Sequence, residues 1–354
     1  MTLIETAVDK GLLPDPVLRT GIRRLLRRRL AEIGAGDPVR ERARTDAWAE
    51  AIRRGPLVVA ADAANEQHYE VPAAFYELVL GRHLKYSSAW FDDDRADDDL
   101  DGAEAAMLAL TCERAGLEDG QEVLELGCGW GSLTLWMAER FPGARITALS
   151  NSASQRRFIE ARAAERALTN LSVVTANVAD FAPAARFDRV VSVEMLEHVR
   201  NYEEMFRRVR RWLEPDGRLF FHVFAHRSSP YPFETTGDDD WMGKHFFTGG
   251  QMPSPGLFDR FRSDLETEER WTVPGTHYAR TAEAWLRRLD RDSAAVESVF
   301  AATYGPGEAR TWVHRWRVFF LACAELFRFD DGREWFVHHA RLRATGREAR
   351  EGRR

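Results

Sequence analysis

The sequence has few cysteines, no long apolar run and no apolar leader. Its three cysteines, Cys112, Cys128 and Cys323, show no CxxC spacing, which excludes a disulfide scaffold and a cysteine-rich zinc site. No stretch of about 18 apolar residues is present, so no segment is predicted to span a membrane. The first residues lack the apolar core of a signal peptide, and we therefore expect a cytoplasmic protein.

An excess of positive charge is also absent. The 354 residues include 50 Lys and Arg against 56 Asp and Glu, and the net charge of −6 argues against a general binder of nucleic acid. Hydrophobic residues make up 44% and charged residues 30%, which indicates a globular rather than a disordered chain. At roughly 150 residues per domain, the length predicts two domains or one large α/β unit with extensions.

Residues 1–65 are predicted to form an arginine-rich helical extension. Apolar residues recur at near-helical spacing among arginines over residues 17–34, and a second helix is expected over residues 39–55. A basic amphipathic helix can lie on an anionic membrane or receive an acidic partner. The apolar stripe is short and carries no Trp or Phe anchor, which favours packing on the rest of the protein. Peripheral membrane contact stays open as the alternative.

Short apolar strands alternate with amphipathic helices from about residue 119 to residue 226. The predicted strands cover residues 122–126, 144–150, 171–176, 187–194 and 217–226, and the predicted helices between them cover residues 132–141, 153–167 and 201–213. This alternation implies a parallel sheet with helices on both faces. Ligands of such sheets bind beyond the carboxyl ends of the strands, so catalytic groups are expected there.

Residues 227–354 are rich in aromatic side chains and less periodic. We predict a loop over residues 241–256, helices over residues 281–293 and 309–329, and a frayed tail over residues 341–354. Together these segments are expected to form a lid and a wall over the strand ends.

The first candidate site is the glycine turn in LELGCGWG, which follows a predicted strand. Gly127 and Gly129 allow the chain to turn sharply and to approach a bound cofactor closely. Such a turn also fits a dinucleotide fold, but three details favour S-adenosylmethionine. Glu125 precedes the turn, the next strand ends in Ser150-Asn151 instead of an acidic residue, and the glycine spacing is not GxGxxG.

The second candidate site is SVEMLEHV, at the end of the fourth predicted strand. If the chain turns helical there, Glu194, Glu197 and His198 share one face, because positions i, i+3 and i+4 are neighbours on a helix. Neighbouring carboxylates raise one another's pKa and an imidazole moderates it, which suits a general base near neutral pH. The alternative is an exposed helix start whose acidic residues are favoured by the helix dipole. No further ligand at regular spacing supports a metal site.

Seven segments spread along the chain carry a family resemblance. They are HYEVPAAFYELVLGRHLKYSSAWF, LELGCGWGSLTLWMAERFP, LSNSASQ, FDRVVSVEMLEHVRNYE, WMGKHFFTGGQMPS, GTHYARTAEAWLRRLD and WRVFFLACAELF. They resemble the cyclopropane-fatty-acyl-phospholipid synthase family of methyltransferases and, within it, the coclaurine N-methyltransferase branch. As a set these segments are highly specific for the family, and the similarity covers nearly the whole chain.

The resemblance implies an α/β fold, a Rossmann-like class I methyltransferase with a seven-stranded, mostly parallel sheet, an N-terminal helical extension and a lid of helices and loops. It implies an extension at residues 1–65 and a methyltransferase domain at residues 66–354. Within that domain, the nucleotide-binding core is expected at about 104–226, and the lid and C-terminal helices at 227–345.

The resemblance also implies S-adenosylmethionine as the methyl donor. The residues implied to bind this cofactor are Tyr86, Ser87, Glu125, Gly127, Gly129, Asn151, Gln155, Asn177 and Val178. Asn151 and Gln155 would face the adenosyl or ribose part. Asn177-Val178 stands where the alkaloid enzymes tend to carry Asp-Ile, which is expected to weaken one hydrogen bond to adenine.

Departures from the family pattern bear on the methyl acceptor. By resemblance, cyclopropane synthases bind bicarbonate through a Cys after Tyr-Ser, a Glu, a His on the fifth strand and a downstream Tyr. Glu197, His222 and Tyr278 match these ligands, but Ser88 replaces the Cys and Glu194 replaces a Gly of the family motif. A carboxylate at Glu194 would repel bicarbonate, which argues against bicarbonate as a cofactor here.

We therefore expect methyl transfer to the nitrogen of a small amine. Glu194 and His198 match the catalytic pair of the alkaloid enzymes, so Glu194, or His198 oriented by Glu197, is expected to remove the proton of the arriving ammonium. Displacement then needs alignment and exclusion of water. The residues expected to shape the acceptor site are Ser88, His222, Trp241, Phe246, Phe247, Tyr278, Trp285 and Trp316.

The sequence leaves two other functions open. An enzyme acting on unsaturated acyl chains of phospholipids is favoured by the family and by the basic N-terminal helix, while Ser88 and Glu194 argue against it. A non-catalytic scaffold that kept the fold is the third alternative. A homodimer is also left open.

Overall fold

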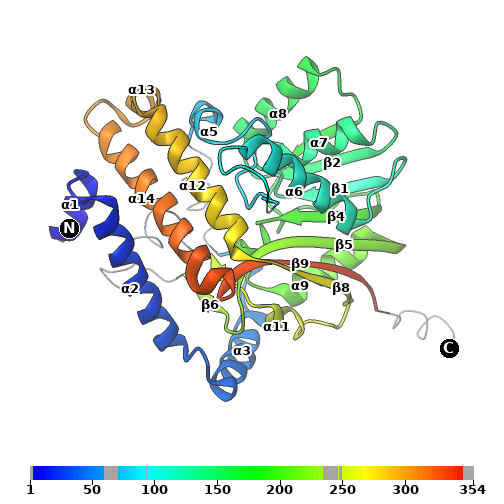
Figure 1. Ribbon diagram of the computed structural model, residues 1–354. Coiled ribbons are helices and arrows are strands. Elements are labelled where there is room, and N and C mark those ends of the chain that lie inside the picture. The colour runs from blue at the N-terminus through cyan, green and yellow to red at the C-terminus, as the bar shows by residue number, and fades with distance from the viewer. Residues whose placement is uncertain (1–2, 60–70, 93, 234–245, 247–248, 346–354) are drawn as a thin grey trace, which may run out of the picture.

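The computed structural model describes residues 3–59, 71–92, 94–233, 246 and 249–345 (Figure 1). Its helices are α1 (Leu3–Asp9), α2 (Asp15–Ile33), α3 (Pro38–Arg53), α5 (Ala73–Val79), α6 (Leu100–Ala115), α7 (Ser132–Arg140), α8 (Ala153–Glu165), α9 (Tyr202–Trp212), α11 (Pro255–Phe258), α12 (Gly275–Arg291), α13 (Ser293–Tyr304) and α14 (Ala309–Arg328), with the short 3-10 helices η1 (Leu196–His198) and η2 (Phe329–Gly332). Its strands are β1 (Glu122–Leu126), β2 (Arg145–Ser150), β3 (Leu171–Thr175), β4 (Phe187–Val193), β5 (Leu213–His226), β6 (Tyr231–Pro232), β7 (Gln251–Met252), β8 (Leu265–Val273) and β9 (Trp335–Ala344).

The main sheet has seven strands in the order β3-β2-β1-β4-β5-β9-β8. Strands β1 to β5 pair in parallel, and β9 runs antiparallel to both β5 and β8. The predicted mostly parallel α/β fold is confirmed. The order of the strands reverses direction between β1 and β4, and a reversal of this kind opens a crevice at the carboxyl ends of the strands.

Helices cover both faces of the sheet, as the alternation predicts. Figure 1 shows α6, α7 and α8 on one face and α3, α9 and α11 on the other. Helix α9 illustrates the local cause. Its buried residues Tyr202, Met205, Phe206 and Val209 recur at helical spacing, and the Asn201 side chain caps its first turn by accepting from the Glu204 backbone N–H.

Residues 227–345 differ from the prediction of a lid and helices alone. Strands β8 and β9 lie in this segment and complete the main sheet, so the sheet is not confined to residues 104–226. The expected tail is also wrong at its start, because Arg341–Ala344 belongs to β9. Both strands pair only with sequence-distant partners, and β8 is an edge strand with many exposed residues, so neither has a strong local signal.

The start of β5 is a second difference. The sequence predicts a helix up to residue 213 and a strand from residue 217, yet β5 already begins at Leu213. Leu213 pairs with Phe187 and Arg218 pairs with Arg189, so the additional residues of β5 form an irregularity within the ladder.

Helices α12 and α14 pack together, and α2 lies along α14 (Figure 1). Ile22, Leu26 and Leu30 of α2 lie against the aromatic core that contains Trp316 of α14. Arg19 of α2 bonds to carboxylates of both α12 and α14. The expected packing of this basic helix on the rest of the protein is confirmed. Across the described ranges, no helix has the length and apolar character needed to cross a bilayer.

Candidate active site

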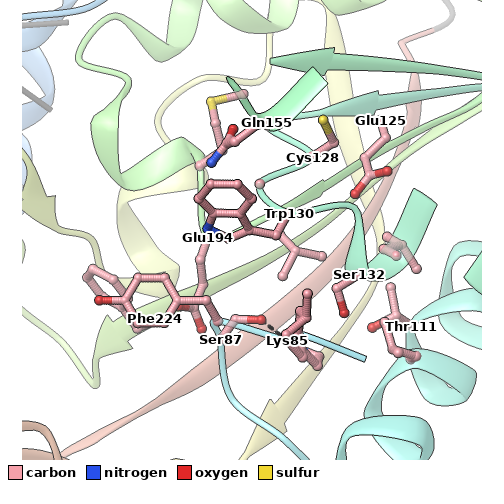
Figure 2. A pocket seen from close by; sticks show the side chains of 18 of the residues that line it. Lys85, Ser87, Thr111, Glu125, Cys128, Trp130, Ser132, Gln155, Glu194 and Phe224 are labelled. Carbon is pink, nitrogen blue, oxygen red and sulfur yellow. Dashed lines mark hydrogen bonds between the residues drawn. The ribbon is translucent and has the colours of Figure 1, made fainter. Parts of the chain in front are cut away.

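A cavity of about 140 Å³ lies at the carboxyl ends of β1 and β4 (Figure 2). Its wall comes from the glycine turn, the start of α7, residues 84–87, the end of β4, and helices α12 and α14. The predicted site residues that line it are Tyr86, Ser87, Glu125, Gly127, Gly129, Gln155, Glu194, His198, Tyr278 and Trp285. The two candidate sites of the sequence therefore meet in one cavity.

The glycine turn between β1 and α7 needs glycine for two separate reasons. Gly127 has φ of +78°, and a Cβ there would meet Met195 Cγ at 2.7 Å. Gly129 has φ of +51°, and a Cβ there would meet nothing within 4 Å. The backbone of Gly129 is therefore exposed on the cavity wall, where a ligand can approach it closely.

Two buried polar side chains stand beside this turn. Glu125 accepts a hydrogen bond from the Thr134 hydroxyl, and burial raises the pKa of its carboxyl to about 7. The Gln155 amide oxygen accepts from the Ser150 hydroxyl at 2.7 Å. In Figure 2, Glu125 and Gln155 lie beside the turn, and Trp130 stands between Gln155 and Ser87. These groups offer hydrogen-bond partners and an aromatic face to a polar ligand.

Lys85 is a cavity residue that the sequence analysis missed. The Glu104 carboxylate holds the preceding turn by accepting from the backbone N–H groups of Gly81 and His83 at 2.8 and 3.0 Å. The Lys85 ammonium is buried and donates to the Ser87 hydroxyl. Burial lowers its pKa to about 8. The only signal in the sequence was a rare lysine directly before Tyr86-Ser87, in a chain that otherwise uses arginine.

Glu194 follows β4 in a backbone conformation that is unusual for a residue other than glycine. Its φ is +48°, and its backbone N–H donates to the His222 carbonyl at 2.8 Å. Such left-handed residues cost free energy and concentrate at functional sites. The turn directs the carboxylate into the cavity, where the side chain is 10% exposed.

Three hydrogen-bond partners converge on this carboxylate. Glu194 Oε1 accepts from the Ser88 backbone N–H, and it lies 3.2 Å from His222 Nε2. Glu194 Oε2 accepts from the Tyr278 hydroxyl at 2.7 Å. Burial raises the pKa of Glu194 to about 7, and the charge of Lys85 and the hydrogen bonds from Tyr278 and Ser88 oppose the rise. The result is a carboxylate poised to exchange a proton near neutral pH.

Glu197 and His198 lie close to Glu194, but not on an α-helix. The predicted helical turn is instead the left-handed Glu194 followed by η1. Glu197 is buried and accepts from the Phe224 backbone N–H at 2.9 Å, and burial raises its pKa well above the ordinary value. Burial lowers the pKa of His198 to about 4, so its imidazole is neutral at pH 7. That Glu197 orients His198 stays a prediction. The described residues contain no group of three or more His, Cys, Asp or Glu that could hold a metal.

The remaining predicted acceptor residues that the structure describes do not line the cavity. Ser88 and His222 contact Glu194 from outside the cavity wall. Phe246 and Trp316 are buried beside Phe319, with their ring centroids 4.4 and 5.4 Å from that of Phe319. Trp241 and Phe247 lie outside the described residues.

Three predicted cofactor residues also lie outside the cavity wall. Asn151 follows β2, and Asn177 and Val178 follow β3, at the sheet edge that bears the cavity. The Asn177 side chain accepts from the backbone N–H of Ala179 and so caps its own turn. Their contact with a cofactor stays a prediction.

The fold and the site together define a class of protein, the S-adenosylmethionine-dependent methyltransferases. The sequence model of the mycolic acid cyclopropane synthetase family matches residues 59–334, and the chain belongs to this family. The resemblance to cyclopropane synthases and coclaurine N-methyltransferases is thereby confirmed.

The relatives divide between amine and lipid enzymes. The chain is 36% identical to (S)-coclaurine N-methyltransferase of Thalictrum flavum subsp. glaucum, over 94% of this chain and 92% of that protein. It is 29% identical to cyclopropane-fatty-acyl-phospholipid synthase of Escherichia coli strain K12, over 78% of this chain and 67% of that protein. A crystal structure of coclaurine N-methyltransferase bound to N-methylheliamine and SAH superposes with a TM-score of 0.92 at 34% identity, covering 96% of this chain and 98% of that one. The protein is a methyltransferase, and S-adenosylmethionine is its methyl donor.

Proposed function

We propose that this protein transfers a methyl group to the nitrogen of a small amine. The observation that carries the proposal is Glu194, a carboxylate on the cavity wall with a pKa of about 7. An amine arrives at neutral pH largely as an ammonium ion, which has no free lone pair. A carboxylate at this position can attract the cation and then accept its proton.

The residues that line the cavity also suit the donor. S-adenosylmethionine supplies an electrophilic methyl group on a positively charged sulfur. Gly129 offers bare backbone, and the aromatic rings of Tyr86 and Trp130 on the wall suit a sulfonium cation. The residues that would hold the donor are Tyr86, Ser87, Glu125, Gly127, Gly129 and Gln155, all on the cavity wall.

The contacts of Glu194 also favour an amine over an alkene. By resemblance, His222 and Tyr278 correspond to bicarbonate ligands of the cyclopropane synthases. In this protein both side chains contact the Glu194 carboxylate instead. A carboxylate of the chain itself thus takes two of the partners that a bicarbonate would use. Its negative charge would also repel that anion.

The acceptor would be a small molecule with an aromatic ring. Trp285 and Phe319 line the cavity opposite the strand ends, and Phe224 lies beside Glu194 in Figure 2. These side chains would cover the apolar part of the amine while Glu194, with His198 as the second candidate base, faces its nitrogen. Alignment of the nitrogen with the methyl group and exclusion of water then supply most of the acceleration.

The proposal is tested by following a labelled methyl group. The enzyme is incubated with methyl-labelled S-adenosylmethionine and either a panel of aromatic secondary and tertiary amines or vesicles of unsaturated phospholipid, and the products are identified by mass spectrometry. We expect N-methylated amines and unmodified lipid. Glu194→Gln should lose about 10²- to 10⁴-fold in rate at pH 7 while still binding S-adenosylmethionine by calorimetry. Label found only in acyl chains, or a Glu194→Gln variant at full rate, would contradict the proposal.

We also propose the division into an extension at residues 1–65 and a methyltransferase domain at residues 66–354, which the family match from residue 59 supports. Peripheral membrane contact through α2, a homodimer and a cytoplasmic location stay predictions. Sedimentation with the same vesicles and analytical ultracentrifugation would test the first two.

A further inference from the structure

Glu194, His222 and His339 lie side by side across three neighbouring strands. Glu194 directly follows β4, and His222 of β5 is paired with His339 of β9. Both imidazoles are fully buried. Arg114, in the last turn of α6, is half-buried and lies with its guanidinium carbon 5.1 Å from the ring centre of Trp271, the residue of β8 paired with His339.

Three hydrogen bonds join these groups in one row. His222 Nε2 lies 3.2 Å from Glu194 Oε1. On its other side, His222 Nδ1 lies 2.9 Å from His339 Nε2. His339 Nδ1 in turn lies 2.8 Å from a terminal nitrogen of Arg114. Each ring nitrogen of both histidines therefore has one partner within the row.

Arg114 determines the direction of all three bonds, because a guanidinium only donates. Burial holds the pKa of both imidazoles well below the ordinary value, so both rings are neutral. His339 Nδ1 accepts from Arg114 and carries no proton, which leaves the His339 proton on Nε2. That proton is donated to His222 Nδ1, so His222 carries its own proton on Nε2 and donates it to Glu194.

We propose that Arg114 and His339 are positioning residues that fix the tautomer of His222 and so keep a hydrogen-bond donor on Glu194. The inference rests on the proposed role of Glu194 as the base. A donated hydrogen bond favours the ionised carboxylate, which burial alone would disfavour. The row does not carry the accepted proton away, because the His222 nitrogen that faces Glu194 already holds a proton.

Other ionisable groups surround this row, and the variants compared below retain all of them. Those that act on the two imidazoles besides their partners are Lys85 and His338. Those that act on Glu194 or respond to its charge are Lys85, Glu197, His198, Tyr278 and Cys323. None of them is changed by a substitution of Arg114 or His339.

The tautomers can be observed directly in the full-length protein. Long-range proton–nitrogen NMR of enzyme with ¹⁵N-labelled histidine distinguishes protonated from unprotonated ring nitrogens, and His222→Gln and His339→Gln variants assign the signals. We expect both rings to be neutral with the proton on Nε2. In Arg114→Met, the His339 signals should move toward the other tautomer or an exchanging mixture. A proton on Nδ1 of either ring in the wild type, or unchanged signals in Arg114→Met, would overturn the inference.

Kinetics give the second readout. Loss of the donor should raise the pKa of Glu194, so the acidic limb of the kcat–pH curve should move up by about one unit in Arg114→Met and His339→Leu. At acidic pH, the rate of these variants should be roughly tenfold below that of the wild type, and it should recover at alkaline pH. His339→Gln should restore most of the wild-type curve, because an amide can accept from Arg114 and donate to His222.

Arg341→Met is the matched control. Arg341 also lies near the Trp271 ring, 5.8 Å from its centre, and donates to the Arg114 carbonyl and to two carboxylates of β8. Its loss removes a nearby positive charge but no donor to His339, so the NMR tautomers and the limb should stay unchanged. If the acidic limb moves equally in Arg114→Met and Arg341→Met, the loss of a positive charge alone explains the shift, and the inference is overturned. If the wild type methylates no amine but shows the expected tautomers, only the proposed acceptor is wrong.

Discussion

Tyr278 donates a 2.7 Å hydrogen bond to Glu194 although the two residues stand 84 positions apart. The Tyr278 ring is stacked on Phe327, with centroids 4.2 Å apart and planes at 14°, so the hydroxyl is held in place by packing. This contact joins α12, which covers the cavity, to the end of β4, which carries the carboxylate.

The first prediction concerns this contact. Tyr278→Phe keeps the stacked ring and removes one donor to Glu194, and a hydrogen bond to a charged group is worth about 1.5–3 kcal/mol. The pKa of Glu194 should therefore rise by about one unit or more, and the rate at pH 7 should fall several-fold. Tyr304→Phe, on α13 and away from the cavity, is the control. An unchanged rate–pH curve in Tyr278→Phe would show that the contact does not matter for the base.

The second prediction is the pH dependence of the wild type. Glu194 accepts a proton only in its ionised form, and its pKa is about 7. With a saturating amine, kcat should therefore rise with pH through about 7 and then level off, falling about tenfold per unit on the acidic side. Fixed-time assays of kcat in a series of buffers of constant ionic strength measure this pH dependence. A curve already flat at pH 5 would point to a different base or to none.

The third prediction concerns Lys85. Its positive charge lowers the pKa of Glu194 against the effect of burial. Lys85→Met removes this charge, so the acidic limb should move to higher pH by about one unit. The exposed Lys10→Met variant should leave the limb unchanged. If the limb stays in place in Lys85→Met, the two groups are not coupled in the working enzyme.

The fourth prediction concerns the glycine turn. Gly127→Ala combines a left-handed φ with a Cβ placed 2.7 Å from Met195 Cγ, so the turn must shift. We expect a loss of about 1–3 kcal/mol in stability and at least about tenfold weaker binding of SAH by calorimetry. Gly120→Ala has a comparable φ of +84° without any neighbour within 4 Å, and should lose stability alone. Equal affinity for SAH in both variants would show that the conformation of this turn does not matter for cofactor binding.

The fifth prediction concerns the ion pairs between α2 and α14. Glu325 of α14 is 2% exposed; burial would raise its pKa, but hydrogen bonds from Arg23 and Arg19 hold that pKa below the ordinary value. Arg19→Met leaves this carboxylate short of a partner and should cost about 1–3 kcal/mol in denaturant unfolding at pH 7. Arg24→Met, exposed on the same helix, should cost much less.

The same ion pair has a defined pH dependence. Because the folded pKa of Glu325 is depressed, its contribution is complete above the unfolded pKa and is lost as pH falls through the folded value. The difference in unfolding free energy between wild type and Arg19→Met should therefore shrink in acid. A difference that stays constant from neutral pH down to about pH 3 would assign the loss to packing instead.

Much of the nucleotide-binding half could be predicted from the sequence. Strand and helix periodicities are local, so β1 to β4 and α7 to α9 lie close to their predicted ranges. The glycine turn and the Glu194–His198 segment could be predicted because both directly follow a predicted strand, where ligands of a parallel sheet bind. Strands β8 and β9 were missed, since their pairing partners are distant and their local pattern is weak.

The residues of the chain by themselves determined the positions of β1 to β4 and of the glycine turn, and they determined that a carboxylate stands at the end of β4. Only the tertiary structure decided the chemistry of that carboxylate. Its hydrogen-bond partners come from the segment before α6, from β5 and from α12, and the row behind it runs from His222 through His339 to Arg114. The physical reason is that a pKa depends on burial and on the groups that surround a side chain, and those groups meet only when distant parts of the chain pack together.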